Sequence, residues 1–271
     1  MTVPNGWKRA GAPDRDDVVL AVDFEAIGRP EASFRDLIPA VEAAAELWTA
    51  VPPPVPVPAE PFAAHMQHWT AGVLESGRNV VAVLGFCAGS VFATSLATHL
   101  RGSGSEEPLL VLFDPERPTT TTLADQLANA GATVQPLLTP NEAASLDSSL
   151  AAARATSDVA AAATRLIGAY DELVQGPFLR AGLNQRYRDE LARSFRSLMD
   201  YLTAAGSADF AAARHAADVV YSEHWPEAVN EPATMVRLPI EHGSLLRSDR
   251  CREVLSDLLE RRAAASTGAA A

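Results

Sequence analysis

Residues 80–100 read VVAVLGFCAGSVFATSLATHL, and this stretch decides the fold. A valine-rich apolar run ends in Gly-Phe-Cys-Ala-Gly, and a helical pattern follows it. When a strand turns sharply into a helix, the residue at the tip projects outward and its neighbours two positions away must be small. Gly85 and Gly89 meet that need on either side of Cys87. The stretch therefore predicts a strand, a tight turn and a helix, with Cys87 as a candidate nucleophile.

Segments on both sides of this turn alternate between apolar strands and amphipathic helices. Short apolar runs predict strands at 18–24, 47–52, 80–86, 108–114, 217–225 and 233–239, whereas helical spacing predicts helices at 33–46, 61–77, 119–132 and 251–265. This alternation indicates an α/β protein with a mainly parallel, doubly wound sheet. With 271 residues, the chain is long enough for one such domain.

The alternation is interrupted over residues 139–212. Thr139-Pro140-Asn141-Glu142 combines an N-cap, a first-turn proline and a capping-box glutamate, and helical patterns follow with no strand between them. We expect a helical insertion within a single domain that spans 1–271. Residues 1–16 and 263–271 are expected to be terminal tails.

Composition and charge exclude several classes of protein. The net charge of −12 argues against nucleic acid as the main partner, because phosphate binding needs a concentrated basic face. No apolar run is long enough to suggest a membrane span, and the first residues lack a signal-peptide pattern, so a cytoplasmic location is expected. Cys87 and Cys251 lie far apart and predict neither a disulfide nor a metal site. His65 and His68 lack a third ligand, so no metal is expected there either.

Two further residues stand where partners of Cys87 would be needed. Asp114 ends the predicted strand 108–114, and His242 follows the strand 233–239 and precedes the last helix. The chain order nucleophile, acid, histidine is that of an α/β-hydrolase. The helix after Cys87 directs its positive end at the thiol and presents the Ala88 N–H as a candidate oxyanion donor.

The sequence from about residue 17 to 260 resembles the α/β-hydrolase thioesterases of polyketide and nonribosomal peptide assembly lines. GFCAG matches the nucleophile motif of that family, which usually carries serine, and the segment 18–41 resembles its first core strand, oxyanion loop and following helix. The resemblance implies a Cys87–His242–Asp114 triad, a second oxyanion donor at the backbone of Glu25 or Ala26, and a lid at 139–212. It also implies an acyl or peptidyl carrier protein as partner, whose phosphopantetheine carries the substrate, with no resident cofactor.

The resemblance predicts cleavage of acyl thioesters through an acyl-cysteine, with release or transfer of the acyl group in natural-product biosynthesis. Two alternatives stay open. GFCAG also resembles the cysteine motif of the dienelactone hydrolases, although their acid follows a later strand and they lack a long helical insertion. The third interpretation is a non-catalytic, hydrolase-like protein that binds an acyl carrier.

Overall fold

The computed structural model of the protein describes residues 3–11, 15–24, 32–54, 60–102, 107–210, 217–229 and 232–269, with side chains to residue 265. Within these ranges the chain forms a seven-stranded sheet in the order β1-β3-β2-β4-β5-β6-β7. Its strands are β1 (Trp7–Ala10), β2 (Asp17–Val22), β3 (Glu46–Ala50), β4 (Asn79–Phe86), β5 (Leu109–Phe113), β6 (Asp218–Tyr221) and β7 (Thr234–Arg237). All neighbouring pairs are parallel except β1 with β3, so the predicted mainly parallel sheet is confirmed.

Strand β1 lies in the segment that was expected to be an N-terminal tail. It pairs antiparallel with β3 at the edge of the sheet. The Trp7 indole is buried against Trp69, and its Nε1–H donates to the Trp69 carbonyl at 3.0 Å. The expectation of a tail at 1–16 is therefore wrong for Trp7–Ala10, because burial of Trp7 and pairing with β3 hold this stretch in the sheet.

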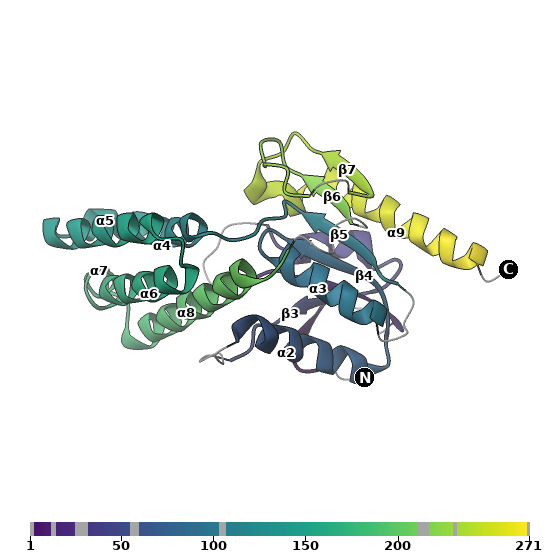
Figure 1. Ribbon diagram of the computed structural model, residues 1–271, viewed down its shortest axis with the longest axis horizontal. Helices are drawn as coiled ribbons and strands as arrows, with labels where there is room; N and C mark the ends of the chain where they lie inside the picture. Colours follow the sequence, from purple (N-terminus) through teal and green to yellow (C-terminus); the bar gives the residue numbers. More distant parts are fainter. Residues whose placement is uncertain are drawn as a thin grey trace.

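Helices cover both faces of the sheet, which confirms the doubly wound arrangement (Figure 1). One face carries α2 (Pro61–Ser76) and α3 (Gly89–Gly102), and the other carries η1 (Phe34–Leu37), α1 (Ile38–Val41), η4 (His242–Arg247) and α9 (Asp249–Ala269). Each face has its own apolar core. Helix α9 continues through most of the tail expected at 263–271. In the described ranges no helix combines the length and the apolar character needed to cross a bilayer.

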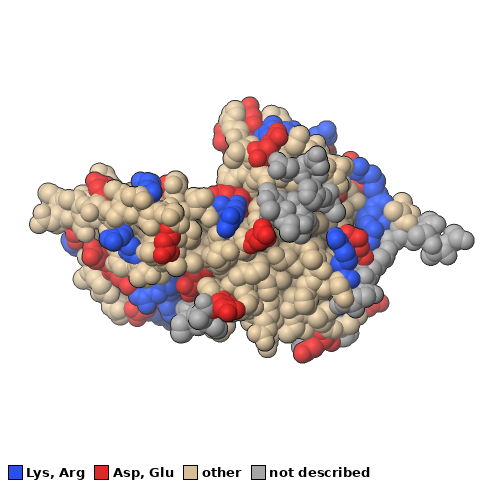
Figure 2. All heavy atoms as spheres, in the orientation of Figure 1, with Lys and Arg blue, Asp and Glu red and all other residues tan. Residues whose placement is uncertain are grey.

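A bundle of helices lies between β5 and β6 in the chain and projects away from the sheet (Figures 1 and 2). It consists of α4 (Thr120–Val134), η2 (Gln135–Leu137), α5 (Pro140–Ala155), α6 (Val159–Gln175), α7 (Pro177–Arg180) and α8 (Gln185–Ser207). Helix α4 packs against α5 and α6, so the inserted bundle begins nineteen residues before the expected boundary at 139. Helix α4 therefore packs mainly on other helices of the bundle.

His65 joins the inserted bundle to the body of the protein. Its imidazole is 1% exposed and lies against Trp69 and Phe92 of the body and Tyr201 of α8, with ring centroids 5.3, 5.3 and 5.9 Å away. The ring Nδ1 lies 2.7 Å from the carbonyl oxygen of Pro61. Burial lowers the pKa of His65 to about 4, although the contact with the Pro61 carbonyl opposes the shift. His65 is therefore neutral in the folded protein at pH 7.

We predict that His65 makes the folded protein lose stability in mild acid. Because the folded pKa lies below the unfolded value of 6.5, protonation favours the unfolded chain as the pH falls from 6.5 toward 4. Between pH 7.5 and pH 5 this linkage corresponds to about 2 kcal/mol. Urea unfolding of the parent and of His65→Gln at both pH values measures it, and the loss should be smaller in the variant. The exposed His99→Gln should behave like the parent; equal acid sensitivity of all three proteins would contradict the prediction.

Candidate active site

Cys87 occupies a tight turn between β4 and α3. Its φ of 51° lies in the left-handed region, which a cysteine adopts at a cost of about 1–2 kcal/mol. Three backbone hydrogen bonds hold the turn. The Cys87 N–H donates to the Phe113 carbonyl at 2.9 Å, and the Cys87 carbonyl accepts from Ser90 at 3.1 Å and from Glu116 at 3.2 Å. The strained tip is thus tied to both α3 and the end of β5.

The two glycines beside Cys87 are needed because other chain segments approach their backbone closely. A Cβ on Gly85 would lie 2.6 Å from the Cα of Ser90, and a Cβ on Gly89 would overlap the carbonyl of Val22. Real Cβ atoms do not approach so closely, so any side chain at either position would force β4, α3 or β2 to shift. The spacing G-x-C-x-G is therefore a steric requirement of this turn.

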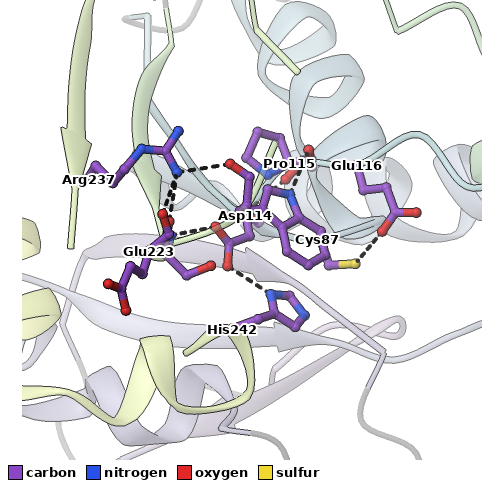
Figure 3. Close-up of polar contacts among 11 residues, drawn as sticks. Cys87, Asp114, Pro115, Glu116, Glu223, Arg237 and His242 are labelled. Carbon is purple, nitrogen blue, oxygen red and sulfur yellow. Dashed lines mark hydrogen bonds and ion pairs between the residues drawn. The ribbon is translucent and has the colours of Figure 1, made fainter. Parts of the chain in front are cut away.

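Asp114 and His242 meet at the carboxyl end of the sheet, beside this turn (Figure 3). Asp114 also has a left-handed φ, of 42°, and its side chain is completely buried. One carboxylate oxygen accepts from the Ser222 N–H at 2.7 Å, and the other lies 2.8 Å from Nδ1 of His242. This contact holds the Nδ1 proton on the Asp114 side, which leaves Nε2 of His242 as the basic nitrogen.

The His242 ring is also held between two aromatic side chains, which the sequence pattern did not reveal. Phe86 stacks on the ring at 4.9 Å and Trp225 at 4.1 Å, with interplanar angles of 16° and 14°. The Trp225 indole N–H in turn donates to the Pro115 carbonyl at 3.4 Å. Stacking on both partner rings restricts how the imidazole can turn, so this arrangement orients the His242 ring.

Arg237, at the end of β7, holds the loop that carries Trp225 (Figure 3). Its guanidinium donates to the carbonyls of Ser222 and Trp225 at 2.8 and 2.9 Å and lies over the Tyr221 ring at 4.9 Å. A planar, multiply donating group is well suited to fix several carbonyls at once. Arg237 consequently fixes the loop after β6, which carries the Trp225 ring that stacks on His242.

Cys87 and His242 line one open cavity of about 650 Å³. The cavity extends between the carboxyl end of the sheet and the inserted bundle, which is where ligand sites collect in open α/β sheets. Its walls come from β4, the segment after β5, helices α4 and α8, and the loop after β6. Asp114 lies behind His242 and is not part of the lining.

The predicted oxyanion donors fall into two groups. Ala88 lines the cavity at the N-terminal end of α3, where helix N–H groups have no partner within the helix. The Ala88 N–H therefore stays a candidate oxyanion donor. Glu25 and Ala26 lie outside the described residues, so the second donor remains a sequence-based prediction.

Glu116 is a further residue of the site that the sequence pattern did not reveal, although it stands only two positions after Asp114. Its carboxylate Oε2 accepts from the Cys87 thiol at 3.5 Å (Figure 3). Its Oε1 accepts from the Thr122 hydroxyl at 2.6 Å. The Glu116 backbone also donates to the Cys87 carbonyl. A carboxylate is thus fixed directly beside the candidate nucleophile.

The fold is similar to that of solved thioesterase domains at low sequence identity. The Vlm2 thioesterase domain with genetically encoded 2,3-diaminopropionic acid, bound with a dodecadepsipeptide, matches with a TM-score of 0.51 and 19% identity over 90% of this chain and 92% of that chain. The NocB thioesterase domain from the nocardicin cluster matches with a TM-score of 0.52 and 13% identity over 92% and 93%. The four-domain nonribosomal peptide synthetase AB3403, bound to AMP and glycine, matches with a TM-score of 0.57 and 12% identity, over 95% of this chain and 20% of that longer chain.

No protein-family model and no curated protein sequence matches the chain. Structural similarity at such low sequence identity shows a shared fold and does not show a shared reaction. Three features of the structure agree with the architecture of these thioesterase domains. They are the parallel sheet, the nucleophile-type turn after β4 and the inserted helices between β5 and β6. The chain has an α/β-hydrolase fold.

Proposed function

We propose that the protein cleaves acyl thioesters through an acyl-Cys87 intermediate and then releases or transfers the acyl group. The single observation that carries this proposal is the convergence of Cys87, His242 and Ala88 on one cavity, with Asp114 bonded to the far side of the His242 ring. This geometry supports nucleophilic catalysis because a nucleophile and a base line the same cavity, and a third residue orients the base.

In the proposed cycle the Cys87 sulfur attacks the thioester carbonyl while Nε2 of His242 accepts the thiol proton. The Ala88 N–H stabilises the negative charge that develops on the carbonyl oxygen. The imidazolium then gives its proton to the departing thiol, and Asp114 stabilises the charged ring throughout. Ser222 holds Asp114 in position through its backbone N–H.

A sulfur nucleophile favours transfer over simple hydrolysis. The acyl-cysteine is itself a thioester, so loading from another thioester retains the activation of the acyl group, whereas a serine ester would lose much of it. The intermediate therefore stays reactive toward a second acceptor. We propose that the acyl donor is carried by the phosphopantetheine of a carrier protein in natural-product biosynthesis, and the similarity to Vlm2, NocB and AB3403 supports this assignment.

Cys251, the second cysteine, does not compete for this role. It lies in α9 with no exposed surface. Burial raises the pKa of its thiol to about 12, and the negative charge of Asp114 adds to the shift. A buried thiol of this kind is inert at neutral pH because only the thiolate reacts as a nucleophile.

We predict that Cys87→Ala abolishes acyl-enzyme formation. Incubation of the parent with octanoyl-pantetheine should add the mass of one octanoyl group, seen by intact mass spectrometry, and peptide mapping should place it on Cys87. Cys251→Ala is the matched control and should form the adduct at the parent rate. An adduct that persists in Cys87→Ala would contradict the proposal, and the absence of any adduct in the parent would favour a non-catalytic carrier-binding protein.

We also predict that only one of the two thiols is alkylated in the folded protein. At pH 7.5 iodoacetamide should modify Cys87, which is half-buried at the cavity, and spare the fully buried Cys251. In denaturant both thiols should react. Mass spectrometry counts the adducts, and the folded Cys87→Ala protein should take up none. Labelling of Cys251 in the folded protein at a rate near that of Cys87 would show that α9 does not bury it as described.

A further inference from the structure

Glu116 gives the cavity a negative charge that the proposed thioester cleavage does not use. Its carboxylate contacts the Cys87 thiol at 3.5 Å and the Thr122 hydroxyl at 2.6 Å, and both of these donors are neutral. Among the ion pairs of the described residues, none involves Glu116. The side chain of neighbouring Arg117 is directed elsewhere, since its Nε–H donates to the Gly206 carbonyl at 3.0 Å. The charge beside the nucleophile therefore has no protein cation to balance it among the described residues.

Thr122 fixes the Glu116 carboxylate through the N-terminus of α4. The Thr122 side chain belongs to the capping box of this helix, in which Thr119 is the N-cap. A helix N-terminus favours a nearby anion. The Glu116 backbone is tied as well, because its N–H donates to the Cys87 carbonyl at 3.2 Å. The carboxylate is thus built into the nucleophile turn and is not a mobile surface group.

The part of the cavity next to Glu116 is polar along one face of α4. The cavity-lining residues of this helix include a set at helical spacing, namely Thr122, Asp125, Gln126 and Asn129. Residues three and four apart lie on one face of a helix. Asp125 is paired with Arg154, whereas Gln126 and Asn129 supply amide donors and acceptors. A polar wall therefore leads from solvent to Glu116.

The other cavity-lining helix presents apolar side chains. Leu198 and Leu202 of α8 line the cavity together with Tyr201, whose ring packs on Phe24 at 5.3 Å. Such an apolar surface suits an acyl chain, whereas the polar face of α4 suits a polar second substrate. The cavity thus has a polar wall on α4 and an apolar wall on α8, and Cys87 lines the same cavity.

We propose that the acyl acceptor is a polar primary amine, bound as an ammonium ion by Glu116 and along the polar face of α4. This inference rests on the proposed acyl-Cys87 intermediate and names its acceptor. An ammonium group is the complement of an unbalanced carboxylate, because charge-assisted hydrogen bonds are stronger than neutral ones. At 3.5 Å from the sulfur, Glu116 holds the amine nitrogen within reach of an acyl carbon attached to Cys87.

The transfer step balances without any further reactant. The bound ammonium first releases one proton to solvent and becomes a neutral amine. Its nitrogen attacks the acyl carbon, forming the C–N bond, and the C–S bond to Cys87 breaks. The second proton passes from nitrogen to Nε2 of His242 and from there to the departing sulfur. The products are an amide and the free Cys87 thiol.

Glu116 also couples amine binding to the state of the nucleophile before any acyl group is loaded. With no amine bound, the thiol donates to the carboxylate, and the negative charge opposes formation of a thiolate beside it. A bound ammonium takes over the carboxylate and removes that opposition. Alkylation of Cys87 should therefore become faster when an amine binds.

The first experiment measures the fate of the loaded enzyme. The octanoyl-Cys87 enzyme is mixed with 1,4-diaminobutane or with 1,4-butanediol, and loss of the adduct and formation of amide are followed by mass spectrometry. Loss of the adduct should accelerate and saturate with the diamine, yielding octanoyl amide, and should not change with the diol. Loss at the same rate with and without diamine would overturn the proposal.

Two variants that each remove one carboxylate test the role of Glu116. In Glu116→Gln the half-saturating diamine concentration should rise about tenfold or more, since one charge-assisted contact is lost. Glu253→Gln removes an exposed carboxylate on α9 and should match the parent. Equal half-saturating concentrations in both variants would overturn the assignment of Glu116.

The second experiment needs no acyl donor and so separates this proposal from the proposed function. The rate of Cys87 alkylation by iodoacetamide is measured against 1,4-diaminobutane concentration. It should rise several-fold and saturate in the parent and in Glu253→Gln, and it should be flat in Glu116→Gln. That result in a protein that forms no acyl adduct would overturn the proposed function and keep the amine site. A flat profile in the parent would overturn the amine site.

A third comparison distinguishes an ammonium on the acceptor from one on the donor. Loading rates of Cys87 from glycyl-pantetheine and from acetyl-pantetheine are compared in the parent and in Glu116→Gln. The ratio of the two rates should be the same in both proteins. A preference for the glycyl donor that disappears in Glu116→Gln would overturn the proposal, because Glu116 would then recognise the donor.

Discussion

The buried carboxylate of Asp114 is the constraint on which the rest of the site depends. A charge with no exposed surface is tolerated only where hydrogen bonds replace its water. Asp114 has two such bonds, one from the Ser222 backbone after β6 and one with His242 after β7. Its own backbone N–H donates to Val220 of β6. A single residue therefore fixes the ends of three strands relative to one another and sets the position of the imidazole.

The contacts of Cys87 extend this constraint to the inserted bundle. The Cys87 turn is bonded to Phe113 and Glu116 on either side of Asp114, and Glu116 is bonded to Thr122 at the start of α4. A movement of α4 would therefore displace Glu116 and change its contact with the Cys87 thiol. On the other side of the cavity, Tyr201 of α8 packs against the buried His65. The inserted bundle is consequently linked to the body of the protein through Glu116 and through His65 of α2.

Much of the architecture could be predicted from the sequence because parallel strands buried on both faces form continuous apolar runs. The runs that became β2, β4 and β5 are of this kind, and the glycines around Cys87 mark the turn. Strand β1 could not be predicted, since its four residues carry two charges and its pairing with β3 is non-local. The apolar face of α4 was recognised, but periodicity shows that a face is buried and not what buries it.

The site was predictable only to the level of residue type and order. Strand ends and chain order pointed to Cys87, Asp114 and His242, which the structure brings to one side of the sheet. Trp225 and Glu116 left no sequence signal, because stacking on His242 and contact with the thiol depend on how two loops fold back over the sheet. Glu116 is nevertheless only two residues beyond Asp114 in the chain.

The central claim is that Cys87, His242 and Asp114 act as one unit, and a double-mutant cycle on Cys87 acylation tests it most directly. The acylation rate from octanoyl-pantetheine is measured by rapid quench and mass spectrometry in the parent, Asp114→Asn, His242→Ala and the double variant. We predict that each single change slows acylation by about 10³-fold or more and that the double variant is about as slow as His242→Ala alone. Effects that multiply, or an unchanged rate in Asp114→Asn, would contradict the account.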